Sequence, residues 1–362
     1  MATTIDTPLD PQRIQEFAMR LMGLYGGGML TFMVDIGHRT GLFDAAAAGP
    51  ATSAELAARA GVQERYAREW LGAMVTGGIF EYDAAARSYR LPAEHAACLS
   101  GATAFNMAPV SRLHANLAGQ LDRVVDAFRH GGGVPAGAYR PAFTEVMDGL
   151  NRNALDAVLV DAVIPLAPGL VDRLRGGGRL AEVGCGTGHG IVLLARAFPR
   201  SSFTGYDVEP DAIERARAEA AGAGAGNARF EVRDAATIAS GEERCDAVLC
   251  WDTVHDLADP AGVLRAIHDA LVPGGSFVMV EPMLSSNLED NVGNPMAPMT
   301  YATSTLYCMT QSLAAGGAGL GTAWGEQTAR RLLGEAGFVD LQLHPAPAGN
   351  PINKVFVSRR GA

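Results

Sequence analysis

The sequence contains very little lysine and no long apolar run. Lys354 is the only lysine among 29 basic residues, and the formal net charge is −10. No segment gathers the cations that a nucleic-acid or anionic-lipid surface requires. The N-terminus lacks the basic and apolar parts of a secretory signal, and no uninterrupted apolar run reaches the ~18 residues of a membrane span. We therefore expect a cytoplasmic protein with no membrane partner.

Cysteine is also scarce. The cysteines are odd in number and include no CxxC pair or zinc-binding spacing, since they stand at positions 98, 185, 245, 250 and 308. This pattern is typical of reduced thiols in a reducing compartment, and it argues against a disulfide framework.

Glycine, in contrast, is abundant. The chain has 44 glycines in 362 residues, well above the average of about 7% and without the strict period of collagen. We expect these residues at particular turns and at close approaches of the backbone. The length favours two domains over one.

The first third of the chain predicts helices followed by a small hairpin. Apolar residues recur at helical spacing over residues 11–39, and the three glycines at 26–28 predict an interruption. Shorter helices are predicted at 53–61 and 63–76, and the two hairpin strands at 79–82 and 88–91. This order is that of a winged helix-turn-helix.

Two uses of the winged helix are open at this point. Helix 63–76 offers Arg65 and Arg68 against Glu64 and Glu69, which is a weak basis for entering a DNA major groove. The acidic charge favours a dimerisation and substrate-capping module instead.

The middle of the chain predicts linking helices, with loops at residues 131–139 and at Gly149. We place a winged-helix dimerisation domain at residues 1–95, a helical linker that contributes to the substrate pocket at 96–178, and an α/β domain at 179–362. In the last domain short apolar strands alternate with helices, which indicates a parallel sheet. The predicted strands are 179–183, 202–206, 229–233, 245–250, 275–281, 338–344 and 352–358.

A glycine-rich loop follows the first of these strands. Gly184, Gly186 and Gly188 form a G-x-G-x-G run between a strand and a helix, where the backbone can approach a ligand closely. A dinucleotide fingerprint would need a third glycine where His189 stands. Asp207 ends the second strand, where a carboxylate can accept both hydroxyls of a ribose, and Asp234 ends the third.

These motifs resemble the class I S-adenosylmethionine (SAM)-dependent methyltransferases, which have a Rossmann-like α/β fold. The resemblance rests on the run from Glu182 to Gly188 and on the two acids, Asp207 and Asp234. It implies SAM as the cofactor, held by Glu182, Gly184, Gly186, Gly188, Asp207, Asp234 and Trp251. It also implies a seven-stranded sheet whose last strand is antiparallel.

With the winged domain in front, the chain resembles the small-molecule O-methyltransferases, which form homodimers. Residues 249–260 are similar to that family's W-x-x-H-D-W-x-D run, with Leu257 in place of the second tryptophan. The resemblance implies that His255 is the catalytic base, and a histidine at a strand end suits proton removal at neutral pH. Asp256 could orient His255, cap the next turn or itself act as base.

A second family also resembles this chain. The α-keto acid C-methyltransferases share the winged N-terminus and the His-Asp pair, but use the histidine to hold a metal and the aspartate to remove a proton. They need a further histidine, and this sequence offers Tyr307 and Cys308 in the similar stretch. We therefore expect no metal; if one is present, His255 and Tyr307 are the candidate ligands.

The acceptor side is defined least by the sequence. Residues 285–324 form an insertion of the length seen in lids. The candidates to contact a small-molecule acceptor are Arg112, His114, Arg140, Tyr307 and Trp324. The favoured function is O-methylation. The alternatives are C-methylation of a 2-oxo acid and a non-enzymatic regulator that binds DNA and senses SAM or a metabolite.

Overall fold

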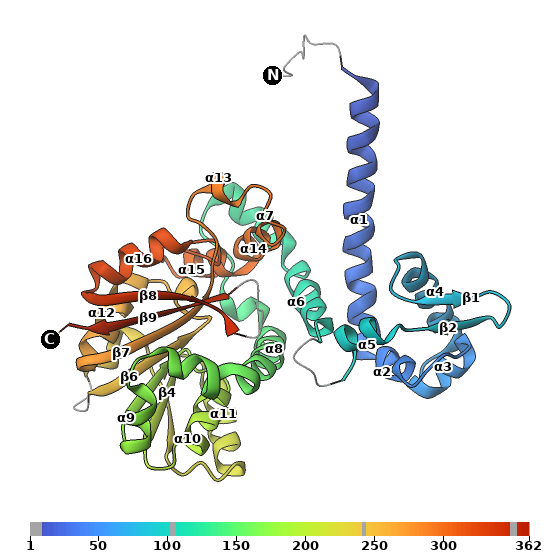
Figure 1. Ribbon diagram of the computed structural model, residues 1–362. Coiled ribbons are helices and arrows are strands. Elements are labelled where there is room, and N and C mark those ends of the chain that lie inside the picture. Colours follow the sequence, from blue (N-terminus) through green and yellow to red (C-terminus); the bar gives the residue numbers. More distant parts are fainter. Residues whose placement is uncertain (1–8, 102–105, 241–243, 348–352, 362) are drawn as a thin grey trace. The chain divides into compact units, whose positions relative to one another are not determined.

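The computed structural model describes residues 9–101, 106–240, 244–347 and 353–361 (Figure 1). The chain divides into two compact units, Met1–Ala115 and Asn116–Ala362. The boundaries that we predict at residues 95 and 178 stay predictions.

The first unit has the element order of a winged helix-turn-helix. Its core contains the packed rings of Phe43, Trp70 and Phe80. A capping box between Thr52 and Glu55 starts the third helix. The elements are α1 (Pro11–Arg39), α2 (Leu42–Ala47), α3 (Ser53–Ala60), α4 (Glu64–Thr76), β1 (Glu81–Asp83), β2 (Ser88–Arg90), α5 (Ala93–Leu99) and α6 (Ala108–Ala118), which continues into the second unit.

The predicted interruption at residues 26–28 is wrong, because α1 is one continuous helix of 29 residues. A glycine costs a helix about 1 kcal/mol relative to alanine, but it keeps its N–H donor and causes no clash, unlike proline. The hydroxyl of Thr31 also donates to the carbonyl of Gly27 inside the tract. Three glycines therefore weaken this helix without ending it.

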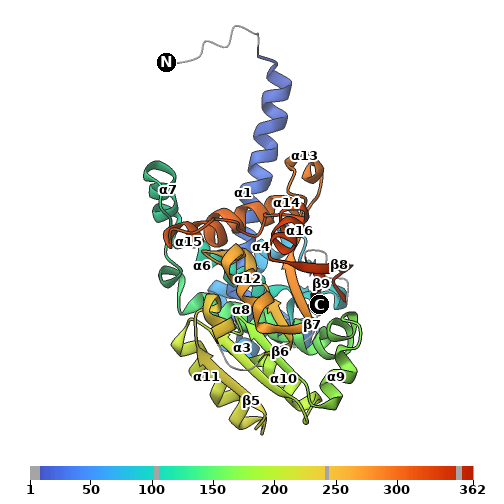
Figure 2. The ribbon, with the colours of Figure 1, turned by 90° about the vertical axis from the view of Figure 1, so that its left-hand side faces the viewer.

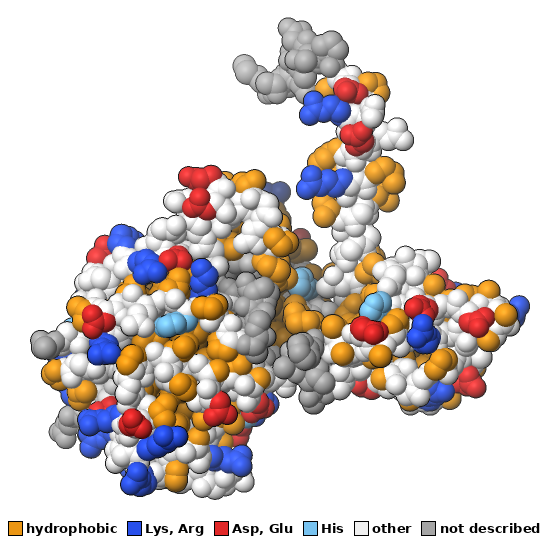
Figure 3. Space-filling model, in the orientation of Figure 1, with side chains coloured by type: hydrophobic (Ala, Val, Ile, Leu, Met, Phe, Trp, Pro, Cys, Tyr) orange, Lys and Arg blue, Asp and Glu red, His pale blue; other side chains and the backbone are white. Residues whose placement is uncertain are grey.

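Large apolar side chains are exposed along α1. Phe17 is 58% exposed, Met22 63% and Tyr25 63%, and the N-terminal half of the helix extends away from α2–α4 (Figures 1 and 3). Length and composition alone would let α1 cross a membrane, and residues 142–166 with 170–176 pass the same test as a pair bent by 104°. Such helices are weak evidence, because core helices of soluble proteins also pass. The predicted dimer through this domain stays a prediction.

The second unit begins with helices that precede the sheet. The predicted loop at residues 131–139 is present, with its second half as the 3-10 turn η1. The predicted loop at Gly149 is wrong, because this glycine lies inside a 17-residue helix with open space around it. The elements are α7 (Leu121–His130), η1 (Ala136–Tyr139), α8 (Ala142–Val158), the π-helical turn η2 (Leu159–Val163), η3 (Ile164–Leu166) and α9 (Leu170–Gly176).

A seven-stranded sheet forms the centre of this unit, as predicted. Its order is β5-β4-β3-β6-β7-β9-β8; β9 pairs antiparallel with β7 and β8, and the other described pairs are parallel. The strands are β3 (Arg179–Val183), β4 (Ser202–Asp207), β5 (Ala228–Val232), β6 (Cys245–Trp251), β7 (Leu271–Pro282), β8 (Phe338–Pro345) and β9 (Asn353–Arg360). Each predicted strand is found with its ends shifted by a few residues at most.

Helices cover both faces of the sheet (Figures 1 and 2). Alternating residues of β6 show the two cores: Ala247 and Leu249 pack with α8–α11, whereas Val248 and Cys250 pack with α12 and α16. The covering helices are α10 (His189–Ala197), α11 (Pro210–Gly222), α12 (Pro260–Ala270) and α16 (Glu326–Glu335), with the 3-10 turns η4 (Ala235–Ser240) and η5 (Val254–Asp256).

The insertion after β7 folds into short helices: α13 (Leu288–Asn291), α14 (Ala297–Thr303), the π-helical turn η6 (Ser304–Cys308) and α15 (Met309–Ala314). Hydrogen bonds tie it to the turn after β6. Gln311 Nε2 donates to the carbonyl of Asp256, Ser312 Oγ to that of Leu257, and the N–H of Gly321 to that of His255. The segment therefore lies against the His255 turn.

Candidate active site

The loop after β3 has a backbone conformation that favours glycine. Gly184, Gly186 and Gly188 have φ angles of 72°, 53° and 81°. The N–H of Gly184 donates to the carbonyl of Tyr206 over 2.8 Å, which ties the loop to the neighbouring strand. Apart from Gly186 itself and its two chain neighbours, no described residue has an atom within 4 Å of the place that a Cβ would take at Gly186. The backbone of the loop is therefore open to a ligand at this residue.

Asp207, the last residue of β4, lies beside this loop. Its Oδ2 accepts a hydrogen bond from the N–H of Gly186 over 2.9 Å, and its Oδ1 accepts one from the N–H of Glu209 over 3.0 Å. Burial raises the pKa of this carboxyl, partly opposed by the bond from Gly186. Each oxygen still has a lone pair free, so the carboxylate can accept two further hydrogen bonds.

The other predicted cofactor residues lie in three different environments. Asp234 is exposed just beyond β5, and its Oδ1 accepts from the N–H of Ala236. Trp251 ends β6 and packs in the core between the sheet and helices α8–α11. Glu182 is 3% exposed, and its Oε2 has no hydrogen-bond partner within the described chain. Burial and the charge of Asp207 raise the pKa of Glu182 to about 8.

His255 is buried at the carboxyl end of the sheet, in η5 directly after β6. It is 2% exposed, and its Nδ1 lies 2.5 Å from Oε2 of Glu281, a fully buried residue of β7. The other oxygen of Glu281 accepts from the N–H groups of Thr253 and Val254. Glu281 therefore fixes both the ring and the turn that carries it, and leaves Nε2 as the ring nitrogen directed elsewhere.

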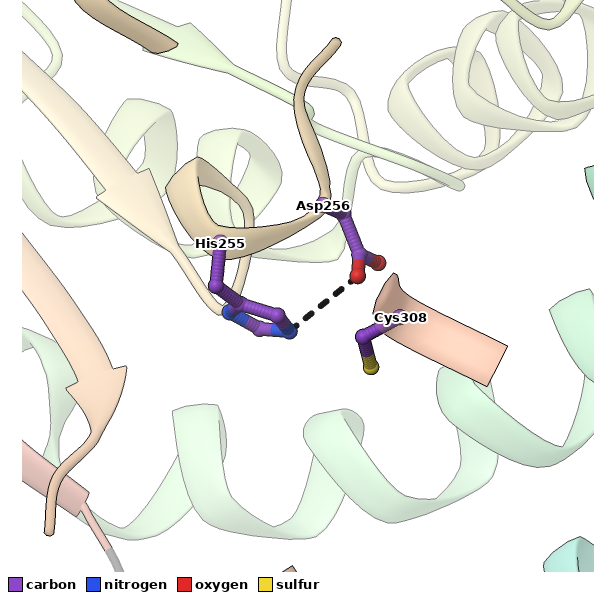
Figure 4. A group of neighbouring side chains, drawn as sticks. All are labelled: His255, Asp256 and Cys308. Carbon is purple, nitrogen blue, oxygen red and sulfur yellow. Dashed lines mark ion pairs between the residues drawn. The ribbon is translucent and has the colours of Figure 1, made fainter. Parts of the chain in front are cut away.

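Asp256 and Cys308 lie on the Nε2 side of His255 (Figure 4). Nε2 is 3.3 Å from Oδ1 of Asp256. The ligand atoms of His255, Asp256 and Cys308 all lie within 4.8 Å of one another. Burial by itself lowers the pKa of His255, but the charges of Glu281 and Asp256 raise it well above its usual value. Burial raises the pKa of the Cys308 thiol to about 12, so this sulfur is protonated near neutral pH.

The turn after β6 also contacts the glycine loop. A Cβ at Gly184 would lie 2.4 Å from Cγ2 of Thr253, two residues before His255. The glycine loop with Asp207 and the His255–Glu281 pair are therefore neighbours at the carboxyl ends of the strands. Ligands of open α/β sheets bind at these strand ends.

Two stretches of the chain match known domain families. Residues 28–101 match the Rv2258c-like winged HTH domain, and residues 174–337 match the methyltransferase domain. A putative O-methyltransferase from Nostoc punctiforme has the same fold, with 19% identity, a TM-score of 0.70 and coverage of 98% of this chain and 100% of that one.

The chain has a winged-helix domain followed by a class I methyltransferase domain.

Human N-acetylserotonin methyltransferase, solved in complex with SAM, is similar over 99% of this chain and 100% of its own, with 19% identity and a TM-score of 0.65. Among curated proteins, the trans-aconitate 2-methyltransferase of Streptomyces coelicolor is 35% identical over 105 residues, which is 29% of this chain and 34% of that protein. The chain spans between a third and two thirds of the length of such curated relatives.

Aromatic rings pack next to Cys308 in the methyltransferase domain. Tyr307 stacks on Phe143 with the ring centroids 3.7 Å apart, and Tyr139 meets Tyr307 edge-on. Arg140 is paired with Glu209. Trp324 is 5% exposed and packs in the core of the α12 and α16 face.

The remaining acceptor candidates, Arg112 and His114, belong to α6 in the first unit. Nδ1 of His114 lies 3.0 Å from the carbonyl of Val110, one turn earlier. Arg112 lies close enough to His38 to contribute to lowering its pKa, an effect that is mainly due to burial. A role for either residue in acceptor binding stays a prediction.

Sequence reasoning missed the partners of His255 in the methyltransferase domain. The position of Glu281 at the end of β7, the strand that pairs with β6, was a usable signal for one of them. Sequence reasoning considered Cys308 only as a substitute for a missing histidine. Cys308 follows Tyr307 in the π-helical turn η6, and no sequence pattern marks that turn.

Proposed function

We propose that this chain is a SAM-dependent methyltransferase that transfers a methyl group to an oxygen of a small molecule, with His255 as the general base. The observation that carries the proposal is the buried His255–Glu281 pair beside the glycine loop. A buried histidine that is fixed at one ring nitrogen by a carboxylate is arranged to exchange a proton at the other.

The residues of the loop fit SAM as the cofactor. Asp207 has two free lone pairs for the two ribose hydroxyls, and the open backbone at Gly186 leaves room for the ligand. Asp234 is exposed at the next strand end, where its carboxylate can accept from an amine of the adenine. When bound, SAM supplies an activated methyl carbon, so the protein needs only to position the acceptor and remove its proton.

In this mechanism the chain acts through two groups. The carboxylate of Glu281 holds the proton on Nδ1 of His255, which makes Nε2 the acceptor atom. Nε2 then takes the proton of the acceptor hydroxyl, and Glu281 stabilises the imidazolium that results. Asp256, 3.3 Å from Nε2, adds to this stabilisation.

A direct test follows the methyl group. Purified full-length protein is incubated with methyl-labelled SAM and a panel of phenols, carboxylic acids and 2-oxo acids, and the products are analysed by mass spectrometry. We expect SAM binding by calorimetry and label on the oxygen of one acceptor class. A protein that does not bind SAM contradicts the proposal, and label on a carbon of a 2-oxo acid favours the second candidate below.

Metal-assisted C-methylation of a 2-oxo acid is the second candidate. It is supported by the neighbouring nitrogen, oxygen and sulfur donors of His255, Asp256 and Cys308, a set that suits zinc better than Tyr307 does. A metal on Nε2 would exclude His255 as base. We expect elemental analysis of the purified protein to find far less than one metal per chain. One metal per chain that is lost in Cys308→Ala would instead establish the second candidate.

A DNA-binding role for the winged helix has little support. In α4, Arg65 pairs with Glu69 and Arg68 with Glu64, each one helical turn away. These arginines are thus neutralised within their own helix, whereas phosphate binding needs uncompensated cations.

A further inference from the structure

Helix α8 places a row of charged side chains against the glycine loop. Asp148, Arg152 and Asp156 are spaced by four residues and therefore share one face of the helix. Their partners are Thr187 of the loop, His189 at the start of α10, and two residues of α11, Arg215 and Glu219. The proposed function uses none of these contacts.

The contact nearest to the cofactor loop is between Thr187 and Asp148. Thr187 is 7% exposed, and its hydroxyl donates to Oδ1 of Asp148. The same oxygen accepts from Nη2 of Arg152 over 3.1 Å, and Oδ2 accepts from Arg215 over 3.3 Å. Asp148 is thereby held on its own helix and on α11, so it is a fixed anchor for Thr187.

His189, at the start of α10, is a further member of this hydrogen-bond network. Its Nε2 lies 2.8 Å from Oδ1 of Asp156, and its Nδ1 lies 2.6 Å from Oε1 of Glu219. Arg152 binds Glu219 with both of its terminal nitrogens, over 2.8 and 2.7 Å. Although burial raises the pKa of Glu219, the hydrogen bonds from Arg152 and His189 lower it overall. A bidentate, partly buried network of this kind is stronger than isolated surface pairs.

The loop needs such an anchor because of its composition. Three of its five residues are glycines with positive φ, and a glycine loses more conformational freedom on ordering than any other residue. The other two residues are both fixed: Cys185 packs in the core of the α8–α11 face, and Thr187 is bonded to Asp148. Fixing the loop before the ligand arrives removes an ordering cost from binding.

We propose that Asp148, supported by Arg152, is a positioning residue for cofactor binding: through Thr187 it holds the glycine loop in its binding conformation in the free protein. The inference rests on the proposed function, since it assigns these contacts to SAM affinity. Neither residue is required to touch the cofactor.

The test is a double-mutant cycle on the full-length chain, with the Kd for SAM measured by calorimetry. Thr187→Val and Asp148→Ala each remove the same hydrogen bond, so we expect each to weaken binding by about tenfold, the loss of one bond to a charged group. The double variant should be no weaker than the worse single variant, because the effects of interacting residues do not add. Thr187→Ser and Asp148→Asn keep a donor and an acceptor and should stay within about twofold of the wild type.

A second readout separates positioning from general stability. In the ligand-free protein, amide hydrogen exchange of residues 184–190 should become faster in Thr187→Val. The matched control is Asp246→Ala, near the amino end of the central strand β6, whereas the glycine loop follows the carboxyl end of β3. Asp246 also accepts from an arginine, Arg173, and from a backbone N–H, that of Arg179. This variant should lower the Tm without changing the Kd or the exchange of the loop.

The outcomes divide clearly. An unchanged Kd in Thr187→Val and Asp148→Ala, with a lower Tm as in Asp246→Ala, would give the network a merely structural role and overturn this inference alone. Fully additive losses of affinity would overturn it as well, because they would mean that the two side chains act independently. If the wild-type protein does not bind SAM, both this inference and the proposed function fail.

Discussion

Replacing His255 by asparagine is expected to lower kcat by about 10²- to 10⁴-fold, the usual contribution of a general base. The amide nitrogen of asparagine can still donate to Glu281, so the variant loses Nε2 without leaving a buried carboxylate unpaired. The Kd for SAM should stay within about twofold, because the proposed cofactor contacts lie on the loop and on Asp207. Initial rates and calorimetry on the same preparation give both values.

The matched control for this variant is His268→Asn. His268, in α12, also lies next to a carboxylate, with Nδ1 3.1 Å from Asp269, but it packs on Phe338 away from the His255 turn. Its replacement should leave kcat near the wild-type value. A His255→Asn enzyme as fast as this control would contradict the role of His255 as base.

The pH profile tests the same role through Glu281. Because the charges of Glu281 and Asp256 raise the pKa of His255 above its usual value, the neutral ring that acts as base accumulates only as the pH rises. The kcat of the wild type should therefore increase with pH above neutrality. Glu281→Gln removes the larger of these charges, so the rising limb should move to lower pH. The glutamine amide would also donate to Nδ1 and force the proton onto Nε2, which should lower the plateau. If the rising part of the kcat–pH profile does not move in Glu281→Gln, Glu281 does not set the pKa of the catalytic base.

The sheet could be predicted from the sequence because its signals are local. Each strand is a short apolar run, and each buried residue is followed by one that faces the other core, as Leu249 and Cys250 show in β6. The loop glycines follow β3 directly, and Asp207 is the last residue of β4. Because the carboxyl ends of neighbouring parallel strands lie side by side, the strand order alone predicts that these residues are close together.

The arrangement around His255 depends on contacts between distant segments. Glu281 is 26 residues away and reaches His255 because β6 and β7 pair in the register that sets Trp251 opposite Val280. Cys308 arrives through the π-helical turn in the insertion, whose path no periodic pattern specifies. Strand pairing can be inferred from a sequence, but the direction of a side chain in an irregular insertion cannot.

The errors in the helical regions have a related cause. Glycine commonly marks the end of a helix, so residues 26–28 and Gly149 predict breaks. Their backbone N–H groups nevertheless continue the helices, and neither site requires a positive φ. Conversely, the row of Asp148, Arg152 and Asp156 has the spacing of a solvated helix face, so its charge pattern alone gives no reason to expect contacts with the glycine loop.

Replacing Asp207 by alanine is expected to weaken SAM binding by about 100-fold or more, because the change removes a charged acceptor that can take two ribose hydroxyls, each such bond contributing about 1.5–3 kcal/mol. Part of the loss has a second origin: Asp207 also holds the N–H of Gly186.

Adenosine and 2′,3′-dideoxyadenosine separate the two parts of this loss of affinity. The wild type should prefer adenosine, whereas Asp207→Ala should bind both nucleosides equally, since a loosened loop affects them alike. Asp211→Ala, which removes an exposed carboxylate in the first turn of α11, is the matched control and should keep the preference. A preference that persists in Asp207→Ala would place the ribose elsewhere, and with it the cofactor site proposed for this edge of the sheet.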